Sequence, residues 1–303
     1  KKSLTAPFSV FMLLSKAGKR GSKMNKRRIT SEDIAAFREE LILTEKGAAT
    51  VEKYARDAAA FAAFADGGTI TKMTVIAYKE RLQKTYAPRS VNSMLASVNS
   101  LLAFLGWHDL KVRSLKLQQQ VYCHEEKELT KTEYARLCRA AKHRHNERLY
   151  LILQTICGTG MRVSELQYIT VEAAKRGEAT VRCKGKTRTV FLVKELKQKL
   201  LRFAAKQKIK SGMIFVTRTG KPLGRTNIWR EMKALCKAAN VNPEKVFPHN
   251  LRHLFARVFY NMEKDIAKLA DILGHSSINT TRIYIISTGT EHRKRMESMR
   301  LIL

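Results

Sequence analysis

Apolar residues in the first third of the chain recur every three or four positions, the spacing of one face of an α-helix. This spacing predicts four short helices, over residues 30–43, 50–65, 71–83 and 88–106. The last of them shows the spacing most regularly, at Val91, Met94, Val98, Leu101 and Leu105. Thr30 is followed three residues later by Asp33, a pattern typical of a capped helix start. We therefore expect residues 29–112 to form a small helical domain.

The pattern changes after this domain. Residues 113–127 are polar and have no helical period, which predicts a linker. Thr130 and Glu133 then form a capping box at the start of another helix. Residues 178–192 contain two β-rich runs around a Lys/Gly turn, which predicts a hairpin. The expected fold class is therefore mainly α with a small antiparallel β-sheet, and the second domain covers residues 128–303.

The net charge of the chain restricts which partners it can bind. The 303 residues include 58 Lys+Arg and 26 Asp+Glu, so the formal net charge is +32. Such an excess favours a polyanionic partner, of which nucleic acid is the most common. The basic residues run through the whole chain instead of lying on one amphipathic helix, which argues against a membrane surface. No stretch approaches the roughly 20 apolar residues of a membrane span.

The cysteines and the first residues add two expectations. The five cysteines are isolated and form no C-x-x-C pair, which argues against zinc and disulfides and for a reducing cytoplasm. They are Cys123, Cys138, Cys157, Cys183 and Cys236. Residues 1–28 contain a short apolar run followed by basic residues, and we expect a flexible basic leader or an added segment.

Two stretches in the first half of the second domain carry candidate chemistry. In GTGMRVSEL, glycines break an apolar helix and Arg162 enters the next one, where a helix N-terminus favours an anion. Glu165 could orient the Arg162 guanidinium, although such a pair on a helix is more often a surface ion pair. In CKGKTR, Lys184 and Lys186 flank the hairpin turn and precede Arg188. These side chains could reach a phosphate, or the lysines could simply be exposed and solubilising.

Two further stretches lie nearer the C-terminus. In PHNLRHLF, His249 and Arg252 are three residues apart at the start of a helix, so both can meet one anion. His253 points about 100° away from Arg252 on that helix and is more often structural. In LGHSSINTTRIY, His275 follows the end of a helix and Tyr284 comes nine residues later.

Together these side chains suit the transfer of a phosphodiester without a metal ion. Guanidinium groups stabilise the negative charge that develops on the non-bridging oxygens. Tyrosine has a pKa near 10 and needs cationic neighbours or a base to act as a nucleophile. A lysine at the hairpin turn can protonate the leaving 5′-hydroxyl. A tyrosine ester conserves the bond energy, so strands can be rejoined without ATP, and no cofactor is expected.

The order and separation of these motifs resemble the tyrosine recombinases, the phage-integrase and Xer-like group. The resemblance to their catalytic domain covers residues 125–303, and the preceding helices look like the family's core-binding domain. It implies a C-shaped clamp around duplex DNA that carries specific recombination sites. The implied roles are phosphate binding by Arg162 and Arg252, general-acid catalysis by Lys184, acid/base or phosphate contact by His249, a phosphate hydrogen bond from His275, and a 3′-phosphotyrosine at Tyr284.

The resemblance also implies assembly. Four protomers would hold two DNA sites and exchange strands through a Holliday junction. The protein would be cytoplasmic and nucleoid-associated, and of bacterial, phage or mobile-element origin. Residues 287–303 would dock on a neighbouring protomer or fold back on their own domain. Of the two hairpin lysines, the family pattern favours Lys184 as the acid. The side chains expected to support the site or contact DNA are Glu165, Lys186, Arg188 and His253.

Three other functions use part of this pattern. A type IB topoisomerase employs the same groups but relaxes supercoils as a monomer, and the N-terminal helices favour the recombinase. A non-catalytic DNA-binding regulator would not need all six catalytic side chains. A metal nuclease is disfavoured because the sequence shows no carboxylate cluster. The sequence leaves open the DNA site, and whether the enzyme moves a mobile element or resolves DNA multimers.

Overall fold

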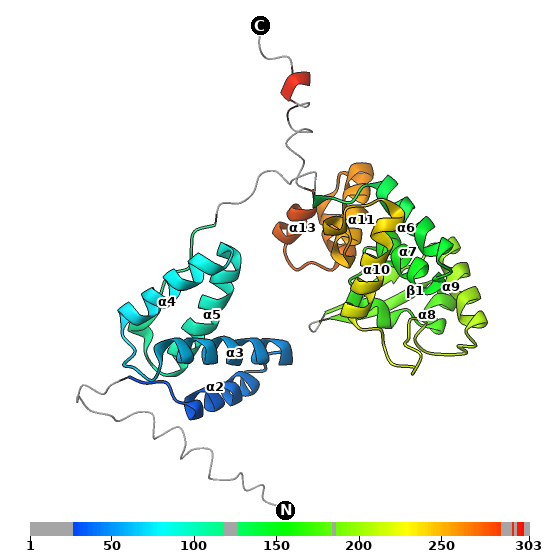
Figure 1. The fold of residues 1–303 in the computed structure, drawn as a ribbon. Helices are drawn as coiled ribbons and strands as arrows, with labels where there is room; N and C mark the ends of the chain where they lie inside the picture. The colour runs from blue at the N-terminus through cyan, green and yellow to red at the C-terminus, as the bar shows by residue number, and fades with distance from the viewer. Residues whose placement is uncertain (1–26, 118–126, 184–185, 286–292, 294–295, 300–303) are drawn as a thin grey trace, which may run out of the picture. The chain divides into compact units, whose positions relative to one another are not determined.

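The structure is a computed structural model that describes residues 27–117, 127–183, 186–285, 293 and 296–299. These residues form two compact units, which divide between residues 119 and 120 of the chain. The prediction of a mainly α fold with a small antiparallel sheet is confirmed (Figure 1). Within the described ranges, no helix is long and apolar enough to cross a membrane.

Unit 1 contains the four helices that the spacing of apolar residues predicted. They are α2 (Ser31–Leu43), α3 (Ala48–Ala65), α4 (Lys72–Thr85) and α5 (Pro88–Phe104), followed by the short 3-10 helix η2 (His108–Leu110). Capping boxes begin α2 at Thr30 and α4 at Thr71. Helix α3 packs against both α2 and α5 (Figure 1). Fully buried apolar side chains on α3 and α5, such as Phe61 and Leu101, lie in the core between them.

Side-chain hydrogen bonds extend unit 1 beyond its helices. The Asn92 side chain on α5 donates to the carbonyl of Leu115 at 2.9 Å and accepts from the Leu115 N–H at 2.7 Å. The start of the stretch 113–127, predicted as a linker, is therefore held on unit 1. Residues 118–126, and residues 1–26 of the predicted leader, lie outside the described residues. Arg27 is described, and its carbonyl accepts from the Ile70 N–H at 2.7 Å.

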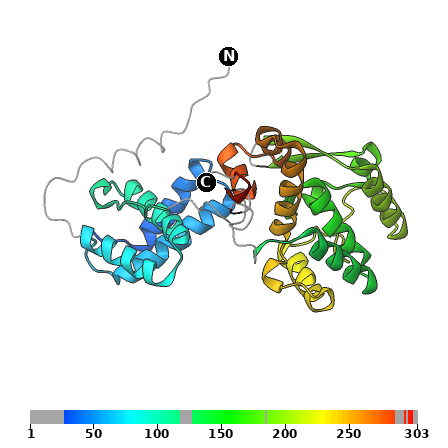
Figure 2. The same ribbon diagram turned by 90° about the horizontal axis from the view of Figure 1, so that it is seen from above.

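Unit 2 is a group of helices packed on one another, and the described residues include one two-stranded sheet. Its α-helices are α6 (Lys131–His143), α7 (Glu147–Thr159), α8 (Val171–Arg176), α9 (Lys194–Lys206), α10 (Arg225–Ala239), α11 (Pro248–Glu263), α12 (Ile266–Leu273) and α13 (Ile278–Ile285). The 3-10 helices η4 (Val163–Tyr168) and η5 (Pro243–Lys245) join them. Helix α11 packs along α7, and α10 packs on α6 (Figures 1 and 2). The sheet contacts α8 and η4.

The predicted hairpin is formed by β1 (Glu178–Cys183) and β2 (Lys186–Phe191). The strands are antiparallel, with Glu178 opposite Phe191 and Cys183 opposite Lys186. Residues 184–185, which join them, lie outside the described residues. The β-rich runs of the sequence thus correspond to paired strands, as the hairpin pattern predicted.

A small apolar cluster fixes helix α13. Ala256 of α11, Leu269 and Leu273 of α12, and Tyr284 of α13 pack together apart from the main core of unit 2. Helix α13 contacts both α11 and α12. The ring of Tyr284 is therefore held by apolar packing, and its hydroxyl is the polar group that can take part in chemistry.

The core of unit 1 gives a direct test of the helical prediction. Leu41 is 3% exposed and Leu43 is 78% exposed, although both lie in the last turn of α2. Leu41→Ala should lower the free energy of unfolding by about 2–5 kcal/mol because it leaves a cavity. Leu43→Ala should change it by less than about 0.5 kcal/mol. Urea unfolding would be followed by Trp107 fluorescence in a Trp229→Phe background, and equal effects of the two variants would contradict the packing.

Candidate active site

The first half of the site is built where α7 ends. Gly160 has φ +66° and ends this helix in the left-handed conformation, which favours glycine. A Cβ on Gly160 would lie 2.4 Å from the Phe255 ring of α11, so the close approach of the two helices also requires glycine. Arg162 follows as the N-cap residue of η4.

A buried carboxylate holds two arginines at this point. Glu165 is 1% exposed, and its Oε1 accepts from Nη1 of Arg162 at 3.0 Å. Its Oε2 accepts from the Arg162 backbone N–H at 2.7 Å and from Nη2 of Arg188 at 2.6 Å. The Arg162–Glu165 pair is therefore no surface ion pair, because its carboxylate is buried. A carboxylate that is shared in this way fixes both guanidiniums and leaves net positive charge.

Arg252 is a fully buried guanidinium that is held by main-chain carbonyls. Its Nη1 donates to the Gly160 carbonyl at 2.6 Å, and its Nη2 donates to the Leu273 carbonyl at 2.7 Å. Both carbonyls lie at the C-terminal ends of helices, α7 and α12, where backbone acceptors are unpaired and the helix dipole is negative. Burial, aided by nearby Arg162, lowers the pKa of Arg252 to about 10, so it remains charged at neutral pH.

His275 completes this group in its neutral form. Its Nε2 lies 2.9 Å from Nη2 of Arg252 and its Nδ1 lies 2.8 Å from Oγ1 of Thr281. Arginine can only donate, so Nε2 of His275 accepts and the proton is on Nδ1, which donates to Thr281. Burial, together with the charge of Arg252, lowers the pKa of His275 to about 4, which agrees with this neutral tautomer.

Tyr284 lies against three histidines. Its hydroxyl is 3.2 Å from Nε2 of His249, and its side chain is almost fully buried. The His253 ring packs on the Tyr284 ring with centroids 4.2 Å apart, and the His275 ring is at 5.3 Å. Burial and the charge of Arg252 lower the pKa of His249, so a neutral Nε2 can accept the tyrosine proton.

The charges of the site favour a phosphate. Of the described residues, Glu165 is the one carboxylate that is hydrogen-bonded to a guanidinium of this group. It bonds Arg162 and Arg188, whereas Arg252 is bonded to two carbonyls and to His275. The group therefore holds three cations and one anion, and Arg252 interacts with Tyr284. Within the described residues, no group of three or more His, Cys, Asp or Glu side chains is placed to hold a metal ion.

The structure brings most of the predicted residues together. Arg162, Glu165, His249, Arg252, His253, His275 and Tyr284 lie in one network, as described above. Arg188 reaches inward to Glu165 instead of outward to solvent. Lys184 lies outside the described residues, and Lys186 begins β2.

The sequence did not predict three groups of the site: Thr281, which is fully buried, and the carbonyls of Gly160 and Leu273. The one available signal was a threonine six residues after His275.

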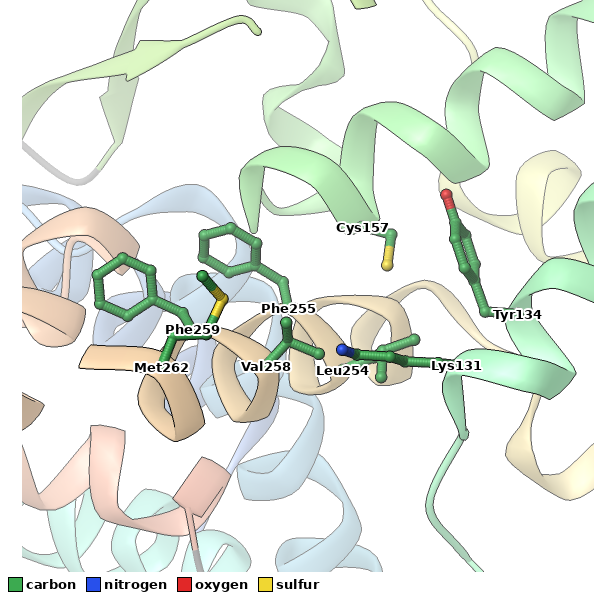
Figure 3. Close-up of a pocket in the computed structure, with 8 residues that line it drawn as sticks. All are labelled: Lys131, Tyr134, Cys157, Leu254, Phe255, Val258, Phe259 and Met262. Carbon is green, nitrogen blue, oxygen red and sulfur yellow. The ribbon is translucent and has the colours of Figure 1, made fainter. Parts of the chain in front are cut away.

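A separate apolar cavity lies on another part of α11. It measures about 460 Å³. It is lined by Lys131, Tyr134, Cys157, Leu254, Phe255, Val258, Phe259 and Met262 (Figure 3). None of the predicted catalytic residues lines it. Helix α11 therefore presents its polar N-terminal residues to the network of arginines and histidines, and apolar residues further along to this cavity.

The buried histidines predict how stability depends on pH. Burial lowers the pKa of His253 to about 4 in the folded chain, whereas an unfolded histidine titrates near 6.5. The folded state disfavours protonation, so this stability is complete above about pH 6.5 and is lost as the pH falls toward 4. His253→Phe keeps a ring on Tyr284 and removes the titration, so its stability should fall less between about pH 7 and pH 5. Urea unfolding at constant ionic strength tests this, and equal losses in both proteins would refute it.

Comparison with known proteins assigns the chain to a family. Residues 127–291, more than half of the chain, match the phage integrase family. Tyrosine recombinase XerA of Pyrococcus furiosus is 28% identical over 290 residues, which cover 92% of this chain and 98% of XerA. Tyrosine recombinase XerH of Campylobacter jejuni is 36% identical over 142 residues, 44% of this chain and 40% of XerH.

Solved structures agree with this assignment. A crystal structure of XerA recombinase has 26% identity and a TM-score of 0.51, and the match covers 91% of this chain and all of that one. A lambda integrase dimer bound to a COC′ core site has 17% identity and a TM-score of 0.69, over 86% of this chain and 96% of that one, and shows the same fold. The arrangement of arginines, histidines and tyrosine and the match over residues 127–291 lead to one conclusion: this chain belongs to the phage integrase family of tyrosine recombinases.

Proposed function

We propose that this protein is a site-specific recombinase that cuts and rejoins duplex DNA through Tyr284. The observation that carries the proposal is the Tyr284 hydroxyl, 3.2 Å from Nε2 of His249, in a site with three guanidiniums, of which two share the carboxylate of Glu165 and the third is held by carbonyls. A nucleophile, a base and an excess of positive charge are the parts that phosphodiester transfer needs. The membership of the chain in the tyrosine recombinases supports the same reaction.

The geometry supports a balanced cleavage step. The Tyr284 oxygen attacks phosphorus and its proton passes to Nε2 of His249. The bond from phosphorus to the 5′ oxygen breaks, which leaves a 3′-phosphotyrosine. Arg162 and Arg252 take up the charge that develops on the non-bridging oxygens. The free 5′ oxygen takes a proton from a general acid, which we assign to Lys184, with Lys186 as the alternative.

Rejoining is the reverse of this step. A 5′-hydroxyl attacks the phosphotyrosine, and the tyrosine oxygen recovers its proton. The phosphotyrosine bond stores the energy of the broken phosphodiester, so the cycle consumes no ATP. Attack by the 5′-hydroxyl of another DNA strand produces recombination in place of simple resealing.

We extend the proposal to the assembly on DNA. Two chains of the same fold support it: a lambda integrase tetramer bound to a Holliday junction, and XerH bound to its difH substrate. For this chain we propose a homotetramer on two DNA sites, with residues 29–112 as a core-binding domain and residues 128–303 as the catalytic domain of a clamp. We also propose that residues 287–303, most of which lie outside the described residues, dock on a neighbouring protomer. The enzyme would act in the cytoplasm, beside the nucleoid.

Two biological roles are compatible with this reaction. A recombinase of this kind can integrate and excise a mobile element or resolve DNA multimers, and the reaction at each site is the same. A type IB topoisomerase would form the same covalent link but would need only one site. A DNA-binding regulator would form no link.

The covalent link is the direct test. Incubation with a suicide duplex, nicked beside the cleavage point within a site that the protein binds, should yield a protein–DNA adduct on a denaturing gel. Tyr284→Phe should abolish the adduct because it removes the attacking oxygen. Tyr260→Phe, on α11, is the matched control and should retain it. If Tyr284→Phe still forms the adduct, the nucleophile is wrongly assigned, and if the wild type forms none, catalysis itself is refuted.

A further inference from the structure

Arg188 links three parts of unit 2 through its guanidinium. It lies in β2, opposite Val181 of β1, and its side chain is 14% exposed. Its Nη2 donates to Oε2 of Glu165 at 2.6 Å and its Nη1 donates to the Ile272 carbonyl at 2.6 Å. One side chain of the hairpin is therefore bonded both to η4 and to the end of α12.

The space for this side chain is provided by a glycine. Gly274 ends α12 with φ +66°, and a Cβ there would lie 2.5 Å from Cδ and 2.8 Å from Nε of Arg188. Any side chain at position 274 would therefore displace Arg188. The N–H groups of Gly274 and His275 return to carbonyls of α12, so the same turn also aims His275.

Each hydrogen-bond partner of Arg188 is itself bonded to, or is next in the chain to, a group that holds Arg162 or Arg252. Glu165 holds Arg162, and Ile272 is the neighbour of Leu273, whose carbonyl holds Arg252. Arg188 also competes for the Glu165 carboxylate. Without it, that carboxylate would neutralise Arg162 alone and reduce the attraction of Arg162 for a phosphate.

We propose that Arg188 is a positioning residue for DNA cleavage, which sets Arg162 through Glu165, and Arg252 and His275 through the end of α12. The inference rests on the proposed function. It does not make Arg188 a DNA contact, because Nη1 and Nη2 both donate within the protein and the side chain is only 14% exposed. Its effect should therefore fall on the cleavage step and not on DNA affinity.

The test separates the cleavage rate from DNA binding. Arg188→Met should reduce the rate of adduct formation at saturating suicide duplex by about 100-fold, the effect expected when reacting groups are misplaced by about 1 Å. The dissociation constant for uncleaved duplex should change by less than threefold (about 0.6 kcal/mol). Arg188→Lys should restore little, because one ammonium does not replace a two-pronged guanidinium. Arg202→Met on α9, an exposed arginine, is the control and should cleave at the wild-type rate.

A second variant keeps the proposal testable if Arg188→Met does not fold. Gly274→Ala should slow cleavage through the same displacement, and its effect should not add to that of Arg188→Lys. Histidine NMR supplies a readout that a purely structural role would not move. The charge of Arg188 helps to lower the pKa of His275, so loss of that charge should raise the pH at which His275 titrates.

Two outcomes would overturn the proposal. Cleavage by Arg188→Met within threefold of the wild type would show that the site does not depend on this side chain. Loss of DNA affinity with an unchanged rate at saturation would make Arg188 a DNA contact. In both cases a wild-type adduct that Tyr284→Phe abolishes would leave the proposed function intact.

Discussion

The candidate active site depends on the burial of one cation, Arg252, between the ends of two helices. A buried guanidinium is costly unless it is hydrogen-bonded, and here Nη1 and Nη2 are directed to the carbonyls of Gly160 and Leu273, while the buried Nε has no partner among the described residues. These acceptors are neutral, so they orient the guanidinium without cancelling its charge. A carboxylate in the same place would have fixed the side chain but lowered its attraction for a phosphate. The packing of α7, α11 and α12 therefore orients the Arg252 guanidinium and leaves its positive charge uncompensated.

The rest of the site follows from this charge. Burial and, second to it, the charge of Arg252 lower the pKa of His249 and of His275 and favour their neutral forms. One can then accept the tyrosine proton, and the other can accept a hydrogen bond from Arg252. The single carboxylate, Glu165, is divided between Arg162 and Arg188, so the group as a whole remains positive. The apolar cluster around the Tyr284 ring holds the proposed nucleophile beside this charge. Each of these features orients a group before substrate arrives, which lowers the reorganisation required in the transition state.

The sequence predicted the fold class and most of the side chains of the site, for reasons that the structure explains. The regular apolar spacing of residues 88–106 reflects real burial, because Val91, Val98 and Leu101 are fully buried in unit 1. Histidine, arginine and tyrosine carry recognisable chemistry, so motifs that contain them could be assigned. Main-chain acceptors carry no such signal, and the carbonyls that hold Arg252 could not be predicted. The inward direction of Arg188 depends on the space left by Gly274, eighty-six positions away, which no local pattern encodes.

The charge of Arg252 can be tested by removing the charge of the substrate. A suicide duplex with a neutral methylphosphonate at the scissile position would be compared with the ordinary phosphate, using wild type and Arg252→Ala, with thermal unfolding to show that the variant is folded. On the phosphate, Arg252→Ala should lose cleavage by at least about 100-fold. On the methylphosphonate, it should cleave to within about tenfold of the wild type, because there is less charge to neutralise. An equal loss on both substrates would show that Arg252 serves to hold the helices together and would contradict its role as the oriented charge of the site.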